Sequence, residues 1–215
     1  MIVRNNDKKL VHMNYQLFVP DEYEANQNME WPIILFLHGN KKRGDNIHLL
    51  DDYGLNWTAE RKQDFKFIVV TPQCPESSSW PFEREAVLTL LDEIISTYRV
   101  DRERVYLVGF SMGGNGAWDL AAFAPERFAA VVPISGWFDT EKALLLKDIP
   151  IWAFHGEDDD VVSIQGSEDM VAALKGVDGD IKFTSYPNLK HFIMDETFSN
   201  PDIYTWMLSH KRLFV

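Results

Sequence analysis

The chain has 215 residues, 46% of them hydrophobic, and no linker rich in proline or serine divides it, so we expect one domain, residues 1–215, without repeats. The net charge of −12 and the pI of about 4.9 argue against a nucleic acid or an anionic membrane as partner, because binding either requires a basic face. Small molecules or neutral polymers fit this charge better.

A single cysteine, Cys74, excludes both an intrachain disulfide and a zinc site built on cysteines. Residues 1–10 are polar and charged and lack the apolar stretch of a signal peptide, and no run approaches the ~18 apolar residues of a membrane span. We therefore expect a cytoplasmic protein from the sequence as it stands, or a secreted one if a signal peptide has been removed.

Apolar runs recur along the chain at intervals too long for hairpins, which is typical of buried parallel strands. After an extended segment at 15–19, the predicted strands lie at 33–37, 67–70, 105–108, 129–134, 151–154 and 181–186. Apolar residues with helical spacing lie between several of them, at 87–98, 112–122 and 162–174. This alternation predicts an α/β fold with a doubly wound, mostly parallel sheet and helices on both faces, in which ligands bind beyond the carboxyl ends of the strands.

The five residues Gly109-Phe110-Ser111-Met112-Gly113 follow the predicted strand at 105–108 and open a helix-forming stretch of small residues. A serine on such a strand-to-helix turn is forced toward positive φ, which is tolerable only if its neighbours are small, as Gly109 and Gly113 are. The turn also directs the first free N–H groups of the helix toward the atom that the serine oxygen attacks. This pattern is typical of a nucleophile elbow.

Ser111 needs a base, because a serine hydroxyl is a poor nucleophile at neutral pH, and the base needs a carboxylate to orient it. In this type of fold the order along the chain is serine, acid and histidine, each in a loop after a later strand. His191 fits this order, because it follows the predicted strand at 181–186. The other five histidines precede the serine, end a strand or lie near the carboxyl terminus: His12, His38, His48, His155 and His210.

The acid is expected in the loop that follows the predicted strand at 151–154. Chain order does not choose among the four carboxylates that crowd this loop, Glu157, Asp158, Asp159 and Asp160. A calcium site is a second interpretation of such a cluster, but the alternating ligands and the characteristic turn of a calcium loop are missing. We therefore expect no metal.

An oxyanion hole requires a second backbone N–H besides that of Met112, and the usual donor lies in the loop after an early strand. Because this loop follows the predicted strand at 33–37, we assign the second donor to Asn40. Gly39 permits the turn, and His38 is expected to be structural. The basic residues that come next are either solvated surface or attract a substrate that carries a carboxylate: Lys41, Lys42 and Arg43.

Residues 136–149 are all that separate two predicted strands near the site, which leaves no room for a large cap domain, so we expect an open site. An open site favours short acyl groups on bulky or polymeric alcohols over long lipid chains. Trp80 and Trp137 are candidates to line the cleft, because aromatic faces stack on sugars and phenolic rings. The alternative is that both tryptophans belong to the core.

With these residues in place, the chain resembles α/β-hydrolases of the phospholipase/carboxylesterase group, which includes enzymes similar to feruloyl and acetylxylan esterases and so-called predicted peptidases. The similarity extends from Tyr15 to Leu208. Besides the elbow and the acidic loop, its marks are Tyr15–Pro20, Phe36–Gly39, Thr71–Pro75 and the ending around His191 and Asp195. It implies the α/β-hydrolase fold without a large cap domain.

The resemblance also implies a role for one acid, since the catalytic aspartate of similar sequences lies four residues after the histidine of a His-Gly pair. Counted from His155, this is Asp159, with Asp160 as the reserve. Relatives often have a glycine before the catalytic histidine, where this chain has Lys190.

The hypothesis that follows is a serine hydrolase that cleaves carboxylic esters through an acyl-enzyme intermediate and uses no cofactor. Its substrates are expected to be small-molecule or carbohydrate esters, with short acyl groups or aromatic acids. Two alternatives remain open: a serine peptidase that uses the same three residues, and a noncatalytic binding protein on the same fold.

Overall fold

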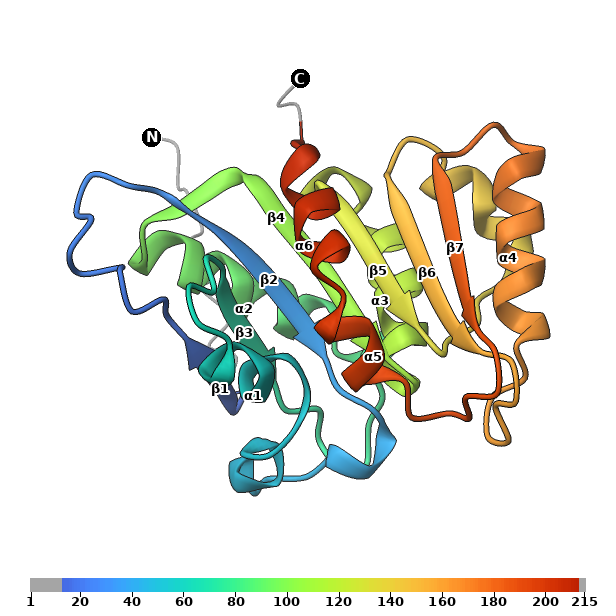
Figure 1. Cartoon of the computed structure of the whole chain (residues 1–215), viewed down its shortest axis with the longest axis horizontal. Coiled ribbons are helices and arrows are strands. Elements are labelled where there is room, and N and C mark those ends of the chain that lie inside the picture. Colours follow the sequence, from blue (N-terminus) through green and yellow to red (C-terminus); the bar gives the residue numbers. More distant parts are fainter. Residues whose placement is uncertain (1–12, 213–215) are drawn as a thin grey trace, which may run out of the picture.

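A seven-stranded sheet forms the centre of the computed structural model, which describes residues 13–212 (Figure 1). The strands are β1 (Tyr15–Phe18), β2 (Trp31–Leu37), β3 (Ile68–Pro72), β4 (Val100–Phe110), β5 (Ala130–Ile134), β6 (Ile151–Gly156) and β7 (Ile181–Tyr186). Their order in the sheet is β1-β3-β2-β4-β5-β6-β7; β1 pairs antiparallel with β3, and the other pairs are parallel. The mostly parallel sheet predicted from the sequence is confirmed, and each predicted strand overlaps an observed one.

Helices cover both faces of this sheet (Figure 1). One face carries α2 (Arg84–Thr97), α3 (Met112–Phe123) and α4 (Gln165–Gly176), and the other carries α1 (Gly54–Arg61), α5 (Met194–Ser199) and α6 (Pro201–Ser209). The apolar periodicity predicted α2, α3 and α4. It did not predict the helices of the second face, because their lengths of 8, 6 and 9 residues are too short for a period of 3.6 to repeat clearly.

The start of α4 differs from the prediction, since the helix begins at Gln165 and not at Val162. The carboxylate of Asp159 explains the difference. Its Oδ1 atom accepts the backbone N–H groups of Val161 at 2.9 Å and of Val162 at 2.8 Å. An aspartate that binds the N–H groups two and three residues ahead stabilises a turn, so these residues form a loop and not the first turn of the helix.

The central strand β2 shows how the two faces of the sheet share the core. All of its side chains are buried, and successive ones point to opposite faces. Ile33, Leu35 and Leu37 pack with the residues of α2, α3 and α4, whereas Ile34 and Phe36 pack with those of α1, α5 and α6. A strand buried on both faces reads as a continuous apolar run, which is why these strands were recognisable in the sequence.

The carboxyl ends of β2, β4, β6 and β7 lie along one edge of the sheet, the lower edge in Figure 1. Because the strands are parallel, the loops that leave them meet at this edge. The connection from β5 to β6 contributes a single short 3₁₀ helix, Thr140–Leu146, and no cap domain. The edge that carries the predicted site is therefore open on that side.

No helix among residues 13–212 is long and apolar enough to cross a membrane. Within the same part of the chain, no three His, Cys, Asp or Glu side chains are grouped so that they could hold a metal ion. Residues 1–10, on which the expectations about a signal peptide and a compartment depend, lie outside the described residues, as does His12.

Candidate active site

Ser111 lies on a sharp turn between β4 and α3, in a strained backbone conformation. Its φ of 58° and ψ of −118° fall in a region that residues other than glycine rarely adopt. The turn is so tight that a Cβ atom on Gly113 would lie 1.9 Å from the carbonyl oxygen of Leu37, and one on Gly109 would lie 2.0 Å from that of Gly113. The predicted positive φ between two positions that must be glycine is confirmed.

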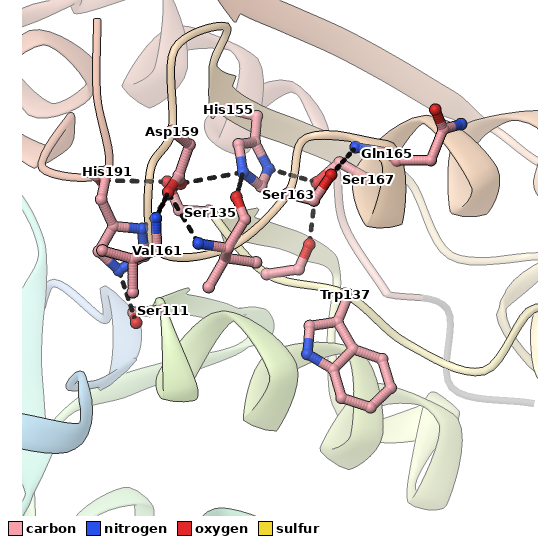
Figure 2. A network of polar contacts seen from close by, with 12 residues as sticks. Ser111, Ser135, Trp137, His155, Asp159, Val161, Ser163, Gln165, Ser167 and His191 are labelled. Carbon is pink, nitrogen blue, oxygen red and sulfur yellow. Dashed lines mark hydrogen bonds and ion pairs between the residues drawn. The ribbon is translucent and has the colours of Figure 1, made fainter.

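His191 lies between Ser111 and Asp159 and contacts both (Figure 2). Its Nε2 atom is 2.8 Å from Ser111 Oγ, and its Nδ1 atom is 2.7 Å from Asp159 Oδ2. The side chain of Asp159 is 0% exposed and that of His191 is 15% exposed. Because a carboxylate can only accept, Nδ1 carries the proton, and Nε2 is left to accept the hydroxyl proton of the serine.

Asp159, and not the reserve candidate Asp160, is the acid that contacts His191. Asp160 instead forms an ion pair with Lys190, with 2.8 Å between Oδ2 and Nζ, and this pairing lowers the pKa of Asp160. Burial raises the pKa of Asp159, but hydrogen bonds from His191 and from two backbone N–H groups outweigh it and leave that pKa below its ordinary value. The carboxylate beside His191 is therefore ionised at neutral pH.

Backbone hydrogen bonds connect the loops that follow β6 and β7. The backbone N–H of Glu157 donates to the carbonyl of Tyr186 at 2.9 Å, and that of Asp158 donates to the carbonyl of Leu189 at 3.0 Å. A Cβ atom on Gly156 would lie 2.4 Å from the same Leu189 oxygen. These contacts bring the acidic loop against the loop that carries the histidine, and they require a glycine after His155.

The loop after β2 brings Asn40 close to Ser111. A Cβ atom on Gly39 would lie 3.4 Å from the Cβ atom of Ser111, and the N–H of Gly39 donates to the hydroxyl of Tyr53 at 3.1 Å. Asn40 begins a 3₁₀ helix, Asn40–Lys42, and Met112 begins α3, so neither N–H has an acceptor within its own helix. The assignment of these two N–H groups to an oxyanion hole stays a prediction.

His38 supports this loop from the core. It is 0% exposed, its Nδ1 atom lies 2.8 Å from the carbonyl oxygen of Gly39, and the N–H of Cys74 donates to its Nε2 atom at 3.0 Å. Burial lowers the pKa of His38 to about 4; the hydrogen bond to Gly39 opposes this effect, and the charges of Lys42 and Arg43 add to it. The ring is thus neutral, with its proton on Nδ1, and His38 is structural as predicted.

Trp80 does not line the cleft, so this prediction is wrong. The side chain is 2% exposed, its Nε1 atom donates to the carbonyl of His38 at 2.9 Å, and its ring meets the imidazole of His38 edge-on at 4.9 Å. A Cβ atom on Gly116 would lie 2.6 Å from the Cβ atom of Trp80. An indole is large enough to fill the space between α3 and the loop after β2, and its N–H satisfies a buried carbonyl there.

The basic residues after Asn40 are held in the structure more firmly than a solvated surface requires. Lys42 Nζ donates to the carbonyl of Leu49 at 2.7 Å and lies 4.7 Å from the centre of the Tyr53 ring. Arg43 Nη1 donates to the carbonyl of Ser78 at 2.9 Å. These two cations shape the loop, and Lys41 is left exposed at its surface.

A cavity of about 450 Å³ lies beside Ser111 and His191. Four apolar or aromatic side chains line it, Tyr53, Phe110, Val161 and Phe192, and its charged lining residues are Lys41, Lys42 and Asp52. Phe192 is 59% exposed, and its ring meets that of Phe110 edge-on at 5.4 Å. The cavity is thus aromatic inside and open to solvent at Phe192.

Trp137 is exposed but is not among the residues that line this cavity. Its backbone N–H donates to Asn115 Oδ1 at 2.8 Å, and its Cβ atom would lie 2.5 Å from a Cβ atom on Gly166. The side chain thus lies between α3 and the start of α4, 54% exposed. A role of Trp137 in binding substrate stays a prediction.

Sequence reasoning missed several residues of the site, among them Tyr53, Phe192 and His155. Tyr53 and Phe192 line the cavity, and His155 lies 3.0 Å from Asp159 through its Nε2 atom. The His-Gly pair at 155–156 located the acid in the sequence, but no signal there shows that the imidazole of His155 is buried against that acid. Nothing in the sequence around Tyr53 indicates that it lies near the serine.

Comparison with known proteins places these features in a family. Residues 83–205 match the phospholipase/carboxylesterase family. A bifunctional acetylxylan esterase/xylanase of Neocallimastix patriciarum is 29% identical over 203 residues, which cover 86% of this chain and 27% of that protein. A protein of Aspergillus niger named probable feruloyl esterase C is 25% identical over 169 residues, which cover 77% of this chain and 62% of that protein.

The fold also matches solved structures. A thermostable esterase superposes with a TM-score of 0.83 at 32% identity, over 96% of this chain and 61% of that one. The chain therefore spans less than two thirds of the length of each of these three relatives. The matched residues 83–205 nevertheless include the elbow, the acidic loop and His191. The chain is a member of the phospholipase/carboxylesterase family and has the α/β-hydrolase fold.

Proposed function

We propose that this chain is an esterase that hydrolyses carboxylic esters with Ser111 as its nucleophile. The observation that supports this most directly is the 2.8 Å contact between His191 Nε2 and Ser111 Oγ, with Asp159 2.7 Å from the other ring nitrogen. A hydroxyl in this position passes its proton to the imidazole as its oxygen attacks. The names of the relatives, which include acetylxylan and feruloyl esterases, support the same reaction class.

In the first half of the proposed reaction, Ser111 Oγ forms a bond to the ester carbonyl carbon, and its proton moves to His191 Nε2. The carbonyl electron pair moves onto oxygen, where the N–H groups of Asn40 and Met112 bind it. When the tetrahedral intermediate collapses, the bond to the alcohol breaks, and His191 returns the proton to the departing oxygen. The products of this half are a free alcohol and an ester of Ser111.

In the second half, water takes the place of the alcohol. His191 accepts one proton of the water as its oxygen attacks the acyl carbon, and the same two N–H groups hold the oxyanion. Collapse breaks the bond to Ser111 Oγ, which recovers the proton from His191. Throughout, Asp159 keeps the ring oriented and stabilises its charged form, so the net reaction adds one water to the ester.

The proposed substrates are small-molecule or carbohydrate esters with a short acyl group or an aromatic acid. A cavity of about 450 Å³ is at the smaller end of ligand sites, which hold about 300–1,000 Å³. Its aromatic walls suit an acetyl group or a single ring. The short connection between β5 and β6 leaves the site open, so that a bulky alcohol remains in solvent.

The Ser111→Ala variant tests the nucleophile. We expect kcat for 4-nitrophenyl acetate to fall at least about 10⁴-fold, because no other group can form the acyl-enzyme. Ser77→Ala is the matched control, since Ser77 is exposed and lies outside the site. A fluorophosphonate probe read by mass spectrometry is expected to label Ser111 in the wild type and in the control. Wild-type turnover by Ser111→Ala refutes the proposal.

Esters and matched amides separate the proposed esterase from a peptidase with the same three residues. The comparison uses an acetate ester and an anilide that share one acyl group. We expect kcat/KM for the ester to exceed that for the anilide by at least about 10³-fold; ratios near one favour the peptidase. A wild-type protein that neither turns over esters nor reacts with fluorophosphonate favours the noncatalytic alternative.

A further inference from the structure

A second imidazole lies behind Asp159, on the side away from Ser111 (Figure 2). His155 is 0% exposed, and its Nε2 atom lies 3.0 Å from Asp159 Oδ2 and 3.0 Å from the carbonyl oxygen of Val162. Its Nδ1 atom lies 2.8 Å from Ser167 Oγ, which in turn lies 2.9 Å from the carbonyl oxygen of Gly136. The imidazole of His155 takes no part in the reaction proposed above.

The partners of His155 decide where its protons are. Both neighbours of Nε2, the carboxylate of Asp159 and the carbonyl of Val162, are acceptors, so Nε2 must carry a proton. If Ser167 donates its hydroxyl proton to Gly136, then Nδ1 is protonated as well and the ring is a cation. If Ser167 donates to Nδ1, the ring is neutral. In either arrangement the Nε2–H bond is directed at the carbonyl of Val162, and Asp159 Oδ2 lies 3.0 Å from the same nitrogen.

Asp159 receives three hydrogen bonds and one further polar contact. Oδ1 accepts the N–H groups of Val161 and Val162, Oδ2 accepts the N–H of His191, and Nε2 of His155 lies 3.0 Å from Oδ2. His155 also supports the turn, because its Nε2–H is directed at the carbonyl of Val162, whose own N–H binds Oδ1. A buried carboxylate surrounded by N–H groups in this way has one orientation, the orientation that faces Nδ1 of His191.

We propose that His155 is a positioning residue for the hydrolysis: its Nε2–H group holds the carbonyl of Val162 and lies beside Oδ2 of Asp159, which keeps Asp159 turned toward His191 and moderates how strongly that carboxylate attracts the proton of the catalytic ring. The inference rests on the proposed function, in which His191 shuttles the proton. His155 touches neither the substrate cavity nor Ser111, so it acts through Asp159 alone. The contacts resemble those by which a partner of a metal-bound histidine orients it and tunes its basicity.

The other charged groups of the loops packed against His155 have partners elsewhere or are exposed. Asp160 pairs with Lys190, and the carboxylate of Glu157 accepts the hydroxyl of Ser185 at 2.7 Å. Asp158 is exposed. Asp159 is thus the charged group of these loops that contacts the ring of His155, and a change at position 155 reaches the site through that carboxylate.

The wild-type protein provides the first test, by ¹⁵N NMR of histidine-labelled protein. The ring signals are assigned by their loss in His155→Gln and His191→Gln. We expect Nε2 of His155 to show the shift of a protonated nitrogen at every pH at which the protein is folded. An unprotonated Nε2 at neutral pH overturns the proposal, and this measurement needs neither a stable variant nor enzymatic activity.

Two substitutions provide the second test. His155→Leu removes the N–H group that binds Val162 and lies beside Asp159, whereas His155→Gln keeps an N–H group in the place of Nε2. We expect His155→Leu to lower kcat about 10–100-fold with little change in KM, and His155→Gln to recover most of the loss. His48→Gln is the matched control, because the side chain of His48 is 78% exposed. All rates are normalised to sites titrated with fluorophosphonate.

The pH profile of kcat/KM separates positioning from mere packing. Without the N–H group of His155 beside it, Asp159 attracts the His191 proton more strongly and favours the charged ring, so the acid limb moves to higher pH in His155→Leu and not in His155→Gln. Equal losses in both variants, with an unmoved acid limb, overturn the proposal. Failure of the proposed function is recognised separately, because the wild type then turns over no ester and Ser111 is not labelled.

Discussion

The nucleophile side and the acid–base side of this site are held in place by different kinds of interaction. At the nucleophile, backbone atoms of Leu37 and Gly113 lie where any Cβ atom would collide with them. At the acid–base side, Asp159 and His191 are placed by hydrogen bonds between two loops. The steric restraints at the nucleophile require glycines at fixed positions, so they appear in the sequence as a short motif. The hydrogen bonds at the acid–base side appear in the sequence only as loops rich in polar residues.

Two neighbouring aspartates give the largest expected contrast. Asp159→Asn keeps the shape of the side chain but favours the wrong tautomer of His191, so we expect kcat for 4-nitrophenyl acetate to fall about 10⁴-fold. Asp160→Asn breaks an exposed ion pair with Lys190 that does not contact His191, and we expect less than a twofold change in kcat. Comparable losses in both variants mean that the acid has been assigned wrongly.

Alanine substitutions at three glycines compare the two kinds of restraint directly. Gly113→Ala places a methyl group 1.9 Å from a main-chain oxygen that cannot move, so we expect the free energy of unfolding to drop by at least about 3 kcal/mol. Gly156→Ala forces apart two loops that can shift, so we expect a stability loss of about 1–2 kcal/mol together with at least a tenfold loss of ester turnover. Urea unfolding and steady-state kinetics measure the two quantities.

Gly176→Ala is the control for both, because nothing lies within 4 Å of the added carbon. It lies at the end of α4, where alanine is a better helix former, and we expect unchanged activity with stability unchanged or up to about 1 kcal/mol higher. Gly113→Ala with wild-type stability contradicts the steric account of the elbow.

The fold and the nucleophile could be predicted because their signals are local. Strands buried on both faces are continuous apolar runs, and the turn at Ser111 needs two glycines at fixed positions. His191 followed from chain order alone. Among the acids, chain order left four candidates, and the resemblance to a family, not the chemistry of the loop, pointed to Asp159.

The features that could not be predicted depend on contacts between distant segments. Trp80 is an aromatic residue in a serine-rich loop, a setting typical of ligand binding. Its indole N–H nevertheless donates to the carbonyl of His38 in another loop. Tyr53 reaches the site because its hydroxyl accepts the N–H of Gly39, 14 residues earlier in the chain. The hydrogen-bond partner of a buried polar group depends on the three-dimensional arrangement of the chain, which the sequence alone does not reveal.

The stability of the nucleophile side is also expected to depend on pH, through His38. Its pKa in the folded protein, about 4, lies below that of the unfolded chain, 6.5, so the unfolded state binds a proton first as the pH falls. Stability that is fully present above pH 6.5 is therefore lost toward pH 4, by about 3 kcal/mol.

Urea unfolding between pH 7 and pH 4 measures this loss. We expect His38→Gln to show a flatter dependence of the unfolding free energy on pH, because the titrating group is gone. The exposed His48→Gln serves as the control and should follow the wild type. Identical slopes in all three proteins would show that His38 is not kept neutral by the fold.

The smallest expected effect concerns the cavity wall. Phe192→Ala removes a ring that packs on Phe110 and Tyr53, so we expect KM for methyl ferulate to rise about tenfold and KM for an acetate ester to change less than twofold. Phe82→Ala is the matched control, since Phe82 is 84% exposed and does not line the cavity. Parallel changes for both esters contradict an aromatic acyl site.

The thiol of Cys74 follows the backbone N–H that binds His38, and it is 0% exposed. Burial, with the charge of Glu83 and against that of Arg43, raises the pKa of Cys74 to about 12. The thiolate that alkylating reagents require is therefore almost absent in the folded protein. Because no other cysteine competes for reagent, the rate of alkylation reports how often the segment beneath the oxyanion loop opens.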